Sequence, residues 1–425
     1  MPGAQSPGFL LSFDIFTTTF STYSALTDMI RYFTAGESHG PALSAIVEGL
    51  PAGVALTEAD INDQLARRQQ GYGRGGRMKI ETDRAEVLSG VRFGKTIGSP
   101  VAMLVRNRDW ENWTTTMSQF EDHAENVSKI MIPRPGHADL TGCVKYGFDD
   151  IRPVIDRSSA RETAARVAAG SLAKAFLRQL GIQIGSYVSS IGPAGEALDH
   201  GRIMEYLSGG AEGLASEADC SEVRMLDRNA EKAAIAAIDK AKADGDTVGG
   251  IVEVFITGVP MGLGSYVQHD RRLDAALVSA LMSIQAIKGA EVGTAFDNAR
   301  RPGSQVHDEL FAGGPEGLRR KSNRSGGIEG SMSNGQPIHL RAAMKPISSL
   351  VSPLMSFNLS NLEAVQSRFE RSDTCAVPAA GVVAEAVVAP VIANALLEKI
   401  GGDHMAEISA RLEQYREELL KRFRG

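Results

Sequence analysis

The sequence SARETAARVAAGSLAKAFLRQLG, residues 159–181, predicts a long helix in the middle of the chain. Ser159 and Glu162 have the spacing of a capping box, in which a hydroxyl and a carboxylate satisfy free backbone N–H groups. Gly181 follows the last apolar residue, as is typical of a helix C-terminus. Strand-like runs lie on both sides of this helix, so helices and strands alternate along the chain.

The pattern continues outward in both directions from residue 31 onward. Thr57 is a plausible N-cap for a helix in which Ile61 and Leu65 face inward. No low-complexity tract or long linker divides the chain, so we expect one α+β body with long functional loops. We predict strands over 44–49, 100–105, 250–257 and 337–344, and further helices over 57–70, 272–288, 376–397 and 404–424.

An internal echo suggests a duplication. Ile46-Val47-Glu48 leads through a glycine and proline turn toward a helix, and Ile251-Val252-Glu253 does the same about two hundred residues later. A repeated strand–turn–helix unit would explain this. Three matched residues are equally compatible with chance.

Composition excludes several classes of protein. The 425 residues are 43% apolar and 23% charged, with 45 glycines, which excludes disorder, collagen and coiled coil. The formal charge is −6, so a general nucleic-acid coat is not expected. Any anion site must come from local clustering of cations.

Cysteine use favours a reducing cytosol. Cys143, Cys220 and Cys375 are odd in number and far apart, with no CxxC pair, so we expect neither a disulfide framework nor a metal site. The membrane-like stretch 376–397 carries Glu385 and two prolines, which favours a buried helix over a membrane span.

The N-terminal stretch lacks the charges of a targeting signal, because no Lys or Arg precedes Arg31. We interpret residues 1–28 as an extension outside the fold, either mobile or made from an upstream start, and residues 29–425 as one folded domain.

Two nucleotide-binding patterns fail on context. Residues 71–76, GYGRGG, satisfy GxGxxG but follow a helix, whereas the dinucleotide fingerprint follows a strand. Residues 90–96, GVRFGKT, are one residue short of a phosphate loop. We reject both.

The glycine-rich segment is notable for its cations: Arg67, Arg68, Arg74, Arg77 and Lys79 lie within thirteen residues. Two unit charges about 6 Å apart repel by roughly 3 kcal/mol at an effective dielectric near 20. Arginines folded inward would therefore need phosphate or carboxylate partners. A solvated basic loop and an RGG-like RNA contact are the alternatives.

Two histidines lie at glycine-bounded or proline-bounded turns. His39 lies in GESHG and His137 in PRPGHAD, and histidine can exchange a proton near neutral pH. Asp156-Arg157-Ser158-Ser159 precedes the predicted helix, where backbone N–H groups favour phosphate. Structural turns and simple capping are the alternatives. Together the motifs predict an enzyme for a small, multiply anionic molecule, with an anion-binding or RNA-binding module as the rival.

As an ordered set, the motifs resemble the chorismate synthase family, over nearly all of residues 30–403. Ser331 stands where many members carry glycine. The matching segments are TAGESHG from Thr34, RRQQGYGRGGRM from Arg67, PRPGHADLTG from Pro133, RSSARETAARVAAG from Arg157, SIQAIKG from Ser283, NRSGGIEG from Asn323, MKPISSL from Met344 and RSDTCAVPAAGVVAEAVVA from Arg371.

This resemblance implies a carbon–oxygen lyase of aromatic amino-acid biosynthesis. The family converts 5-enolpyruvylshikimate 3-phosphate to chorismate by anti-1,4-elimination of phosphate and a C6 hydrogen, with reduced FMN and no net redox change. NADPH and an external reductase are alternative electron sources for the flavin. The rival is a flavin oxidoreductase with net hydride transfer. The implied fold is a β-α-β sandwich of antiparallel sheets and helices, assembled as a cytoplasmic homotetramer without nucleic-acid or membrane partners.

The resemblance also implies residue roles. His39 would protonate the leaving phosphate, His137 would face the pyrimidine edge of the flavin, and Asp373 would serve flavin N5 with Ser159 as a proton relay. The implied substrate contacts, shared in part with NADP, are Ser38, His39, Arg68, Arg74, Arg77 and Arg134. The implied FMN contacts are Arg157, Ser158, Ser159, Gln285, Ala286, Gly330, Lys345, Pro346, Ile347, Ser348, Ser349 and Arg371.

Overall fold

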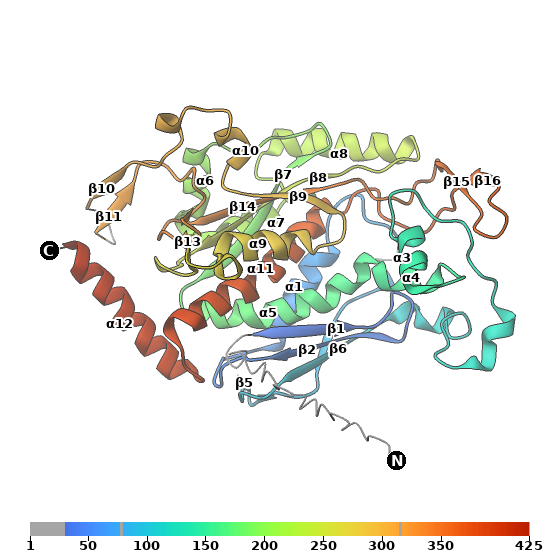
Figure 1. The fold of residues 1–425 in the computed structure, drawn as a ribbon, viewed down its shortest axis with the longest axis horizontal. Helices are drawn as coiled ribbons and strands as arrows, with labels where there is room; N and C mark the ends of the chain where they lie inside the picture. The colour runs from blue at the N-terminus through green and yellow to red at the C-terminus, as the bar shows by residue number, and fades with distance from the viewer. Residues whose placement is uncertain (1–29, 77–79, 314–316, 425) are drawn as a thin grey trace, which may run out of the picture.

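A layer of helices lies between two four-stranded antiparallel sheets in the computed structural model (Figure 1). The structure describes residues 30–76, 80–313 and 317–424. The expected extension over residues 1–28 lies outside the described residues. The α+β class and the β-α-β sandwich are as predicted.

The first sheet has the order β1-β2-β6-β3, formed by β1 (Arg31–Ala35), β2 (Ala42–Glu48), β6 (Val101–Arg106) and β3 (Ala85–Val87). Alternate residues of β2 and β6 are buried, as the period of two in a strand requires when one face meets a core. The strands predicted at 44–49 and 100–105 are thus confirmed.

The second sheet has the order β7-β8-β14-β9, formed by β7 (Gln183–Ile191), β8 (Gly250–Thr257), β14 (Ile338–Met344) and β9 (Ile287–Val292). The predicted strand 250–257 coincides with β8, and the strand predicted at 337–344 begins one residue later than expected.

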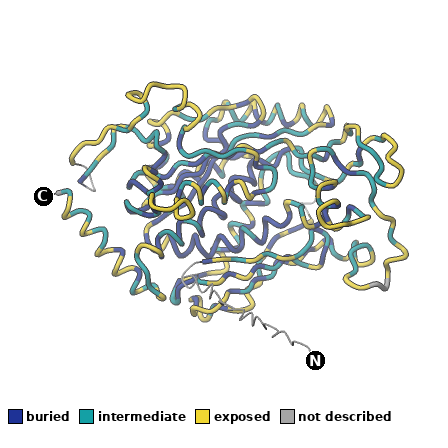
Figure 2. Tube along the Cα trace, viewed as in Figure 1, coloured by how far each residue is buried: buried dark blue, intermediate teal, exposed yellow. Residues whose placement is uncertain are grey.

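Four helices fill the space between the sheets: α1 (Glu58–Gln69), α5 (Thr163–Gln179), α9 (Leu273–Met282) and α11 (Val377–Ile400). Thr57 and Asp60 form a capping box at the start of α1, and Ile61 and Leu65 are buried as predicted. Within the described chain, α11 is the one helix long and apolar enough to cross a membrane. Because 89% of its apolar window is buried, it is a core helix (Figure 2).

The two halves of the sandwich repeat one topology. Each sheet places its first, second, fourth and third strands side by side. In both halves a helix, α1 or α9, joins the second strand to the third, and a long helix, α5 or α11, follows the fourth. The suggested duplication is therefore present, although its sequence echo is out of register. Ile46–Glu48 ends β2 whereas Ile251–Glu253 begins β8.

The N-terminus of α5 differs from the prediction. Ser159 caps a 3-10 turn, Ala160–Glu162, by accepting from the Arg161 N–H, and α5 begins only at Thr163. The Glu162 carboxylate accepts from Thr34 Oγ1 and Arg166 Nε and so does not close a capping box. The prediction of a capping box is wrong because the Glu162 carboxylate forms its hydrogen bonds with Thr34 and Arg166 instead of with the N-cap backbone. Residues 156–158 end helix α4 (Arg152–Ser158) and do not open α5.

The helix predicted over 272–288 is too long. Helix α9 ends at Met282, and the chain enters β9 at Ile287. Arg166 of α5 donates to the Ser283 carbonyl and hydroxyl, and Ala286 has φ +68°, a left-handed conformation that ends a helix. A tertiary contact and a strained turn therefore override helix propensity.

Shorter elements surround the sandwich, and the predicted C-terminal helix is confirmed as α12 (Met405–Arg424). The remaining helices are α3 (Asp139–Tyr146), α4, α6 (His200–Tyr206), α7 (Gly210–Asp219), α8 (Arg228–Ala243) and α10 (Ala295–Asn298). The remaining strands form two-stranded pairs: β4 (Val91–Arg92) with β5 (Lys95–Thr96), β10 (Leu310–Ala312) with β11 (Leu318–Arg320), β12 (Ile328–Glu329) with β13 (Met332–Ser333), and β15 (Met355–Phe357) with β16 (Ala364–Gln366).

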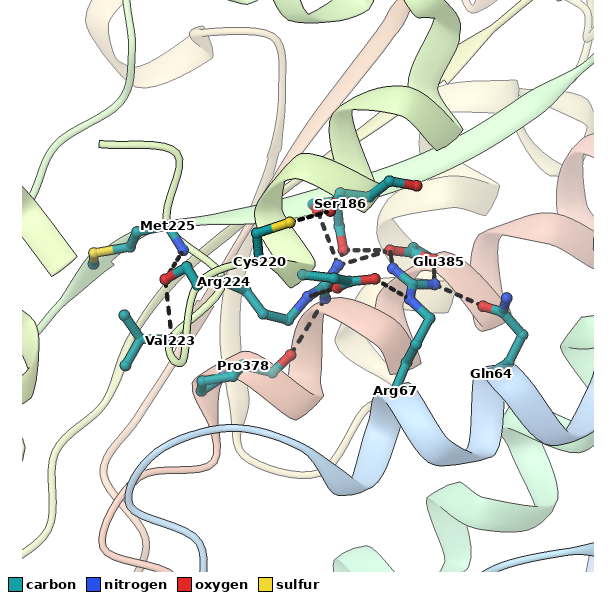
Figure 3. Close-up of polar contacts among 12 residues, drawn as sticks. Gln64, Arg67, Ser186, Cys220, Val223, Arg224, Met225, Pro378 and Glu385 are labelled. Atoms are coloured by element: carbon teal, nitrogen blue, oxygen red, sulfur yellow. Dashed lines mark hydrogen bonds and ion pairs between the residues drawn. The ribbon is translucent and has the colours of Figure 1, made fainter. Parts of the chain in front are cut away.

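A buried ion cluster around Glu385 ties α1 and α11 to β7 (Figure 3), and Lys174 joins α5 to it. Glu385 of α11 is fully buried and accepts from Arg67 at 2.7 and 3.0 Å and from Lys174 at 2.6 Å. Ser186 and Arg224 add contacts of 2.6 and 3.3 Å. Burial alone would raise the pKa of Glu385, but Arg67 and Lys174 outweigh it and hold the pKa well below its usual range. Arg67 of the predicted anion-binding segment is therefore structural.

Candidate active site

A cavity of 860 Å³ opens where loops from the two halves meet, a volume suited to small-molecule ligands. Corresponding segments of each half line it. Residues after α1 and after α9 contribute to it, as do residues before α5 and before α11. Among the described residues, six cationic and three carboxylate side chains line the cavity, which leaves an excess of positive charge: Arg68, Arg74, Arg134, Arg161, Lys345 and Arg371 against Asp109, Glu370 and Asp373.

Most residues predicted for the site line this cavity. They are Ser38, His39, Arg68, Arg74, Arg134, His137, Ser158, Ser159, Gln285, Ala286, Lys345, Ile347, Ser348, Ser349, Arg371 and Asp373.

Three predicted residues do not line the cavity, and Arg77 lies outside the described residues. Arg157 instead donates to the carbonyl oxygens of Thr34 and Gly36, and Pro346 lies between two residues that do line the cavity. Gly330 occupies the tight turn between β12 and β13 with φ +55°. Ser331 follows it at φ +64°, which explains the preference for glycine there, and its hydroxyl donates to Asp274.

The imidazole ring of His39 is held by a hydrogen bond at its edge and by stacking on its face. Its Nδ1 lies 2.6 Å from Oδ1 of Asp156, which also accepts from the His39 backbone N–H. The ring stacks on Trp113 with centroids 3.9 Å apart. Ser38 donates to the Asp156 carbonyl and, through its hydroxyl, to Ser159 Oγ at 3.1 Å. The Ser159 hydroxyl therefore connects to the His39 side of the cavity.

His137 is held by a second buried carboxylate. Its Nδ1 lies 2.5 Å from Oδ1 of Asp139, and Arg134 donates to both oxygens of the same carboxylate. Burial alone would raise the pKa of Asp139, but the hydrogen bonds from His137 and Arg134 hold it well below its usual range. Arg134 also donates to Ser349 Oγ at 2.9 Å, which links this wall to the segment after β14.

The glycine-rich segment reaches the cavity by packing tightly on the start of α11. Gly75 donates to Asp373 Oδ1 at 2.6 Å, and Arg74 Nε lies 3.1 Å from Oδ2. A Cβ at Gly75 would lie 2.8 Å from the Ser372 carbonyl oxygen, so only glycine allows this approach. Burial lowers the pKa of Arg68, and the nearby Asp83 carboxylate opposes this effect.

The segment after β14 contributes the Lys345 ammonium to the cavity wall, next to serine hydroxyls. Lys345 Nζ lies 2.8 Å from Ser348 Oγ, which donates to the Gly136 carbonyl. Burial, followed by repulsion from Lys288, lowers the pKa of Lys345. An ammonium in this setting is stabilised by an anionic ligand.

Two buried polar atoms of the cavity wall have neither a hydrogen-bond partner nor an ion-pair partner among the described residues. They are Ser158 Oγ and Gln285 Oε1. Leaving such groups unsatisfied costs about 1–3 kcal/mol each, so they indicate where a polar ligand completes the site. Both belong to the predicted flavin-binding set, which the residues present therefore fit.

Sequence reasoning missed the supporting carboxylates and the aromatic wall. Asp156 and Asp139 lay inside quoted motifs without an assigned role, although an Asp near a motif histidine is the usual partner of an imidazole. Trp113 and Asp109 come from the loop after β6, which carried no recognisable motif. The i,i+4 spacing of Arg152 and Asp156 could have indicated an ion pair on one helix, and this pair is part of the buried network that holds His39.

Chemically, the cavity can bind several anionic groups and exchange protons at two carboxylate-held imidazoles. The chorismate synthase family model matches residues 30–397. The chain belongs to the chorismate synthase family. A chorismate synthase of Chlorobaculum tepidum is 84% identical over 395 residues, covering 93% of this chain and 100% of that protein. A chorismate synthase of Chlorobium limicola is 72% identical over 397 residues, with the same coverage.

A solved structure supports the same family assignment. A crystal structure of chorismate synthase, 43% identical, superimposes with a TM-score of 0.73 and covers 92% of this chain and 99% of that one. Membership makes the protein a carbon–oxygen lyase of the shikimate pathway, as the motifs implied. It forms chorismate by eliminating phosphate from 5-enolpyruvylshikimate 3-phosphate.

Proposed function

We propose that the 860 Å³ cavity binds 5-enolpyruvylshikimate 3-phosphate beside reduced FMN and that its own residues carry the proton transfers. The observation that carries this proposal is the pairing of a cationic wall with two carboxylate-held histidines. A substrate with one phosphate and two carboxylates matches the excess of positive charge.

The substrate's anionic groups are proposed to lie against Arg68, Arg74 and Arg134. Each of these guanidiniums is already oriented by a carboxylate: Arg68 by Asp83, Arg74 by Asp373 and Arg134 by Asp139. Oriented cations stabilise the departing phosphate without reorganisation during the reaction. The cavity walls exclude water from the developing charges.

The flavin is proposed to lie against residues of the second half, with Ser158 contributed by the first half. Ser158, Gln285, Lys345, Ser348 and Arg371 would hold it, since two of these residues carry unsatisfied buried atoms and one is a cation whose pKa is lowered by burial. Reduced FMN supplies electron density to the substrate as phosphate departs and recovers it at the end, so the reaction has no net redox change.

The proton transfers are assigned to side chains whose orientation is fixed. His39 delivers a proton to the leaving phosphate, with Asp156 at its Nδ1. His137 would face the pyrimidine edge of the flavin, with the Arg134 guanidinium 3.0 Å from its Nδ1. Asp373 would serve N5 of the bound flavin, toward which the C6 hydrogen of the substrate leaves. Its carboxylate is held by the Gly75 N–H. Ser159 relays protons through its contact with Ser38.

The wider setting is proposed on the family resemblance. The protein acts as a cytoplasmic homotetramer, and its flavin is reduced either by NADPH at the cavity or by an external reductase. Residues 29–425 form the catalytic domain. The three cysteines are free thiols, which agrees with a reducing compartment.

An anaerobic assay tests the proposed function. Purified protein is mixed with 5-enolpyruvylshikimate 3-phosphate and photoreduced FMN, and phosphate, chorismate and the flavin spectrum are followed together. We expect equal release of phosphate and chorismate with the flavin still reduced. Oxidation of flavin in proportion to product would instead establish an oxidoreductase. Adding NADPH to oxidised FMN then tests intrinsic reduction.

A further inference from the structure

Asp156 is a buried carboxylate that touches His39 but does not line the cavity. It lies in the last turn of α4, and its side chain is fully buried. Oδ1 accepts from the His39 backbone N–H at 3.1 Å and contacts the ring Nδ1 at 2.6 Å, and the Asp156 carbonyl accepts from the Ser38 N–H at 3.0 Å. One residue therefore fixes the backbone and the ring of the segment that carries His39.

The arrangement extends to a second layer. Trp113 stacks on the face of the His39 ring at an interplanar angle of 26°. The Arg152 guanidinium lies 5.1 Å from the Trp113 ring centroid and 3.5 Å from Asp156 Oδ2. Arg152 thus supports both the stacked ring and the carboxylate. A rigid shell of this kind holds a catalytic group within the narrow range of productive geometry.

We propose that Asp156 is a positioning residue that holds His39 in the tautomer with hydrogen on Nδ1. Nε2 is then the nitrogen that exchanges the proton with the leaving phosphate. An ionised carboxylate also stabilises the imidazolium formed whenever Nε2 is protonated. This inference rests on the proposed role of His39.

The geometry favours Asp156 as the determinant of the tautomer. Asp156 has no hydrogen to donate when ionised, so the ring nitrogen beside it must donate. His137 pairs with Asp139 in the same way, but Arg134 also lies 3.0 and 3.3 Å from its two ring nitrogens. The Nδ1 atom of His137 therefore has both a carboxylate and a guanidinium beside it, whereas the partner at Nδ1 of His39 is the Asp156 carboxylate.

The tautomer can be read directly in the wild-type protein. We would record ¹⁵N spectra of enzyme labelled only at histidine and assign the His39 signal with His39→Asn. At a pH where the ring is neutral, we expect protonated Nδ1 and unprotonated Nε2. A signal of the opposite tautomer overturns the inference, and this measurement depends neither on activity nor on a variant of Asp156.

Asp156→Asn provides the kinetic test. The isosteric amide keeps the volume but can donate to Nδ1, which favours hydrogen on Nε2. We expect kcat to fall about 10²–10⁴-fold, as when the partner of a catalytic histidine is lost, with KM for substrate nearly unchanged. The His39 signal should move toward the other tautomer. A merely structural Asp156 would lower the melting temperature and leave that signal in place, which counts against the inference.

Asp149→Asn is the matched control, because Asp149 lies just before α4, is exposed, and pairs with Lys129 on the surface. It should leave kcat and the His39 signal unchanged. His39→Ala separates the two levels of the argument. Full activity in that variant would remove His39 from the proposed function, whereas the tautomer assignment would still be decided by the wild-type spectrum.

Discussion

Asp373 shows how a single side chain joins two segments of the cavity wall. It accepts from the Gly75 N–H at 2.6 Å and pairs with Arg74, so it holds the glycine-rich segment against the start of α11. Its carboxylate also faces the cavity. Asp373 therefore both holds the cavity wall together and supplies a negative charge to the cavity. A substitution that removes only the charge separates these two roles.

We predict that Asp373→Asn binds FMN normally but loses turnover by at least about 10²-fold, in line with loss of a proton-transfer group. The amide oxygen can still accept from Gly75, so the wall stays in place, while the base at the cavity is gone. FMN affinity by fluorescence titration and anaerobic phosphate release check both parts. Full activity in this variant would remove Asp373 from the proton transfers.

At the scale of single residues, the motifs pointed to side chains that line the cavity and missed side chains that hold those residues in place. Ser38, His39 and His137 were found because glycine or proline turns expose them. Asp156 and Trp113 were not found as site residues, because their roles depend on contacts across 117 and 74 positions of the chain. One sequence alone does not encode such contacts in its local pattern.

At the scale of elements, helix α11 organises the core through Glu385. This carboxylate faces Arg67, Lys174 and Arg224 inside the protein. Removing one partner of a buried ionic group leaves the others uncompensated, which costs more than the intact pair contributes.

We therefore predict that Glu385→Gln lowers the free energy of unfolding by about 3–5 kcal/mol, the range for a broken buried ion pair. Urea denaturation at pH 7 measures it. The control on the same helix is Glu398→Gln, since Glu398 pairs with Arg271 at the surface and about half of each side chain is exposed. It should change stability by less than about 1 kcal/mol. Equal effects of the two variants would contradict the role assigned to the cluster.

The crossing of α5 and α11 depends on one small residue. A Cβ built at Gly170 of α5 would lie 2.2 Å from the Ala386 carbonyl oxygen of α11, so the two helix backbones approach too closely for any side chain. We predict that Gly170→Ala destabilises the protein by about 1–3 kcal/mol through overpacking.

The comparison is Gly213→Ala in α7, where nothing lies within 4 Å of the added Cβ. Alanine has the higher helix propensity, so this variant should gain up to about 1 kcal/mol. Thermal melting of both variants checks the difference in sign. Stabilisation by Gly170→Ala would show that the helices separate more easily than their packing indicates.

Element boundaries were predictable where local chemistry sets them. Thr57 caps α1 as its sequence indicates, since hydroxyl and carboxylate lie within one turn. The predicted start of α5 and the predicted end of α9 were wrong, because Glu162 and Ser283 form hydrogen bonds with residues of distant elements. The strand–helix alternation was readable from periodicity, whereas the pairing of strands into two sheets of matching order was not.

At the scale of the whole molecule, the duplication explains where the cavity lies. Matching segments of the two halves line it together, so neither half forms the cavity alone. The first half supplies both carboxylate-held histidines and the second supplies Lys345 and Asp373. Stability of the joined halves is thus a condition for activity.

That stability should depend on pH through the buried carboxylates. The pKa values of Glu385, Asp139, Glu162 and Glu253 are all lowered, since burial, which raises them, is outweighed by hydrogen bonds and cationic neighbours. A carboxylate whose folded pKa lies below the unfolded value stabilises the fold above the unfolded pKa, near 4. This stabilisation is lost as pH falls through the folded pKa. The lowered pKa of Lys174 acts only in the alkaline range.

We therefore predict that these carboxylates do not change the free energy of unfolding between about pH 5 and 7. Below about pH 4.5 the free energy of unfolding should fall steadily. Urea denaturation across this range measures it. The difference between wild type and Glu385→Gln should shrink on acidification, because the Glu385 carboxyl of the unfolded wild-type chain then binds a proton that the buried, paired carboxylate resists, whereas the amide binds none. A difference that stays constant down to pH 3 would mean that Glu385 contributes through packing and hydrogen bonds alone, and that its charge is not what joins the helices around the cavity.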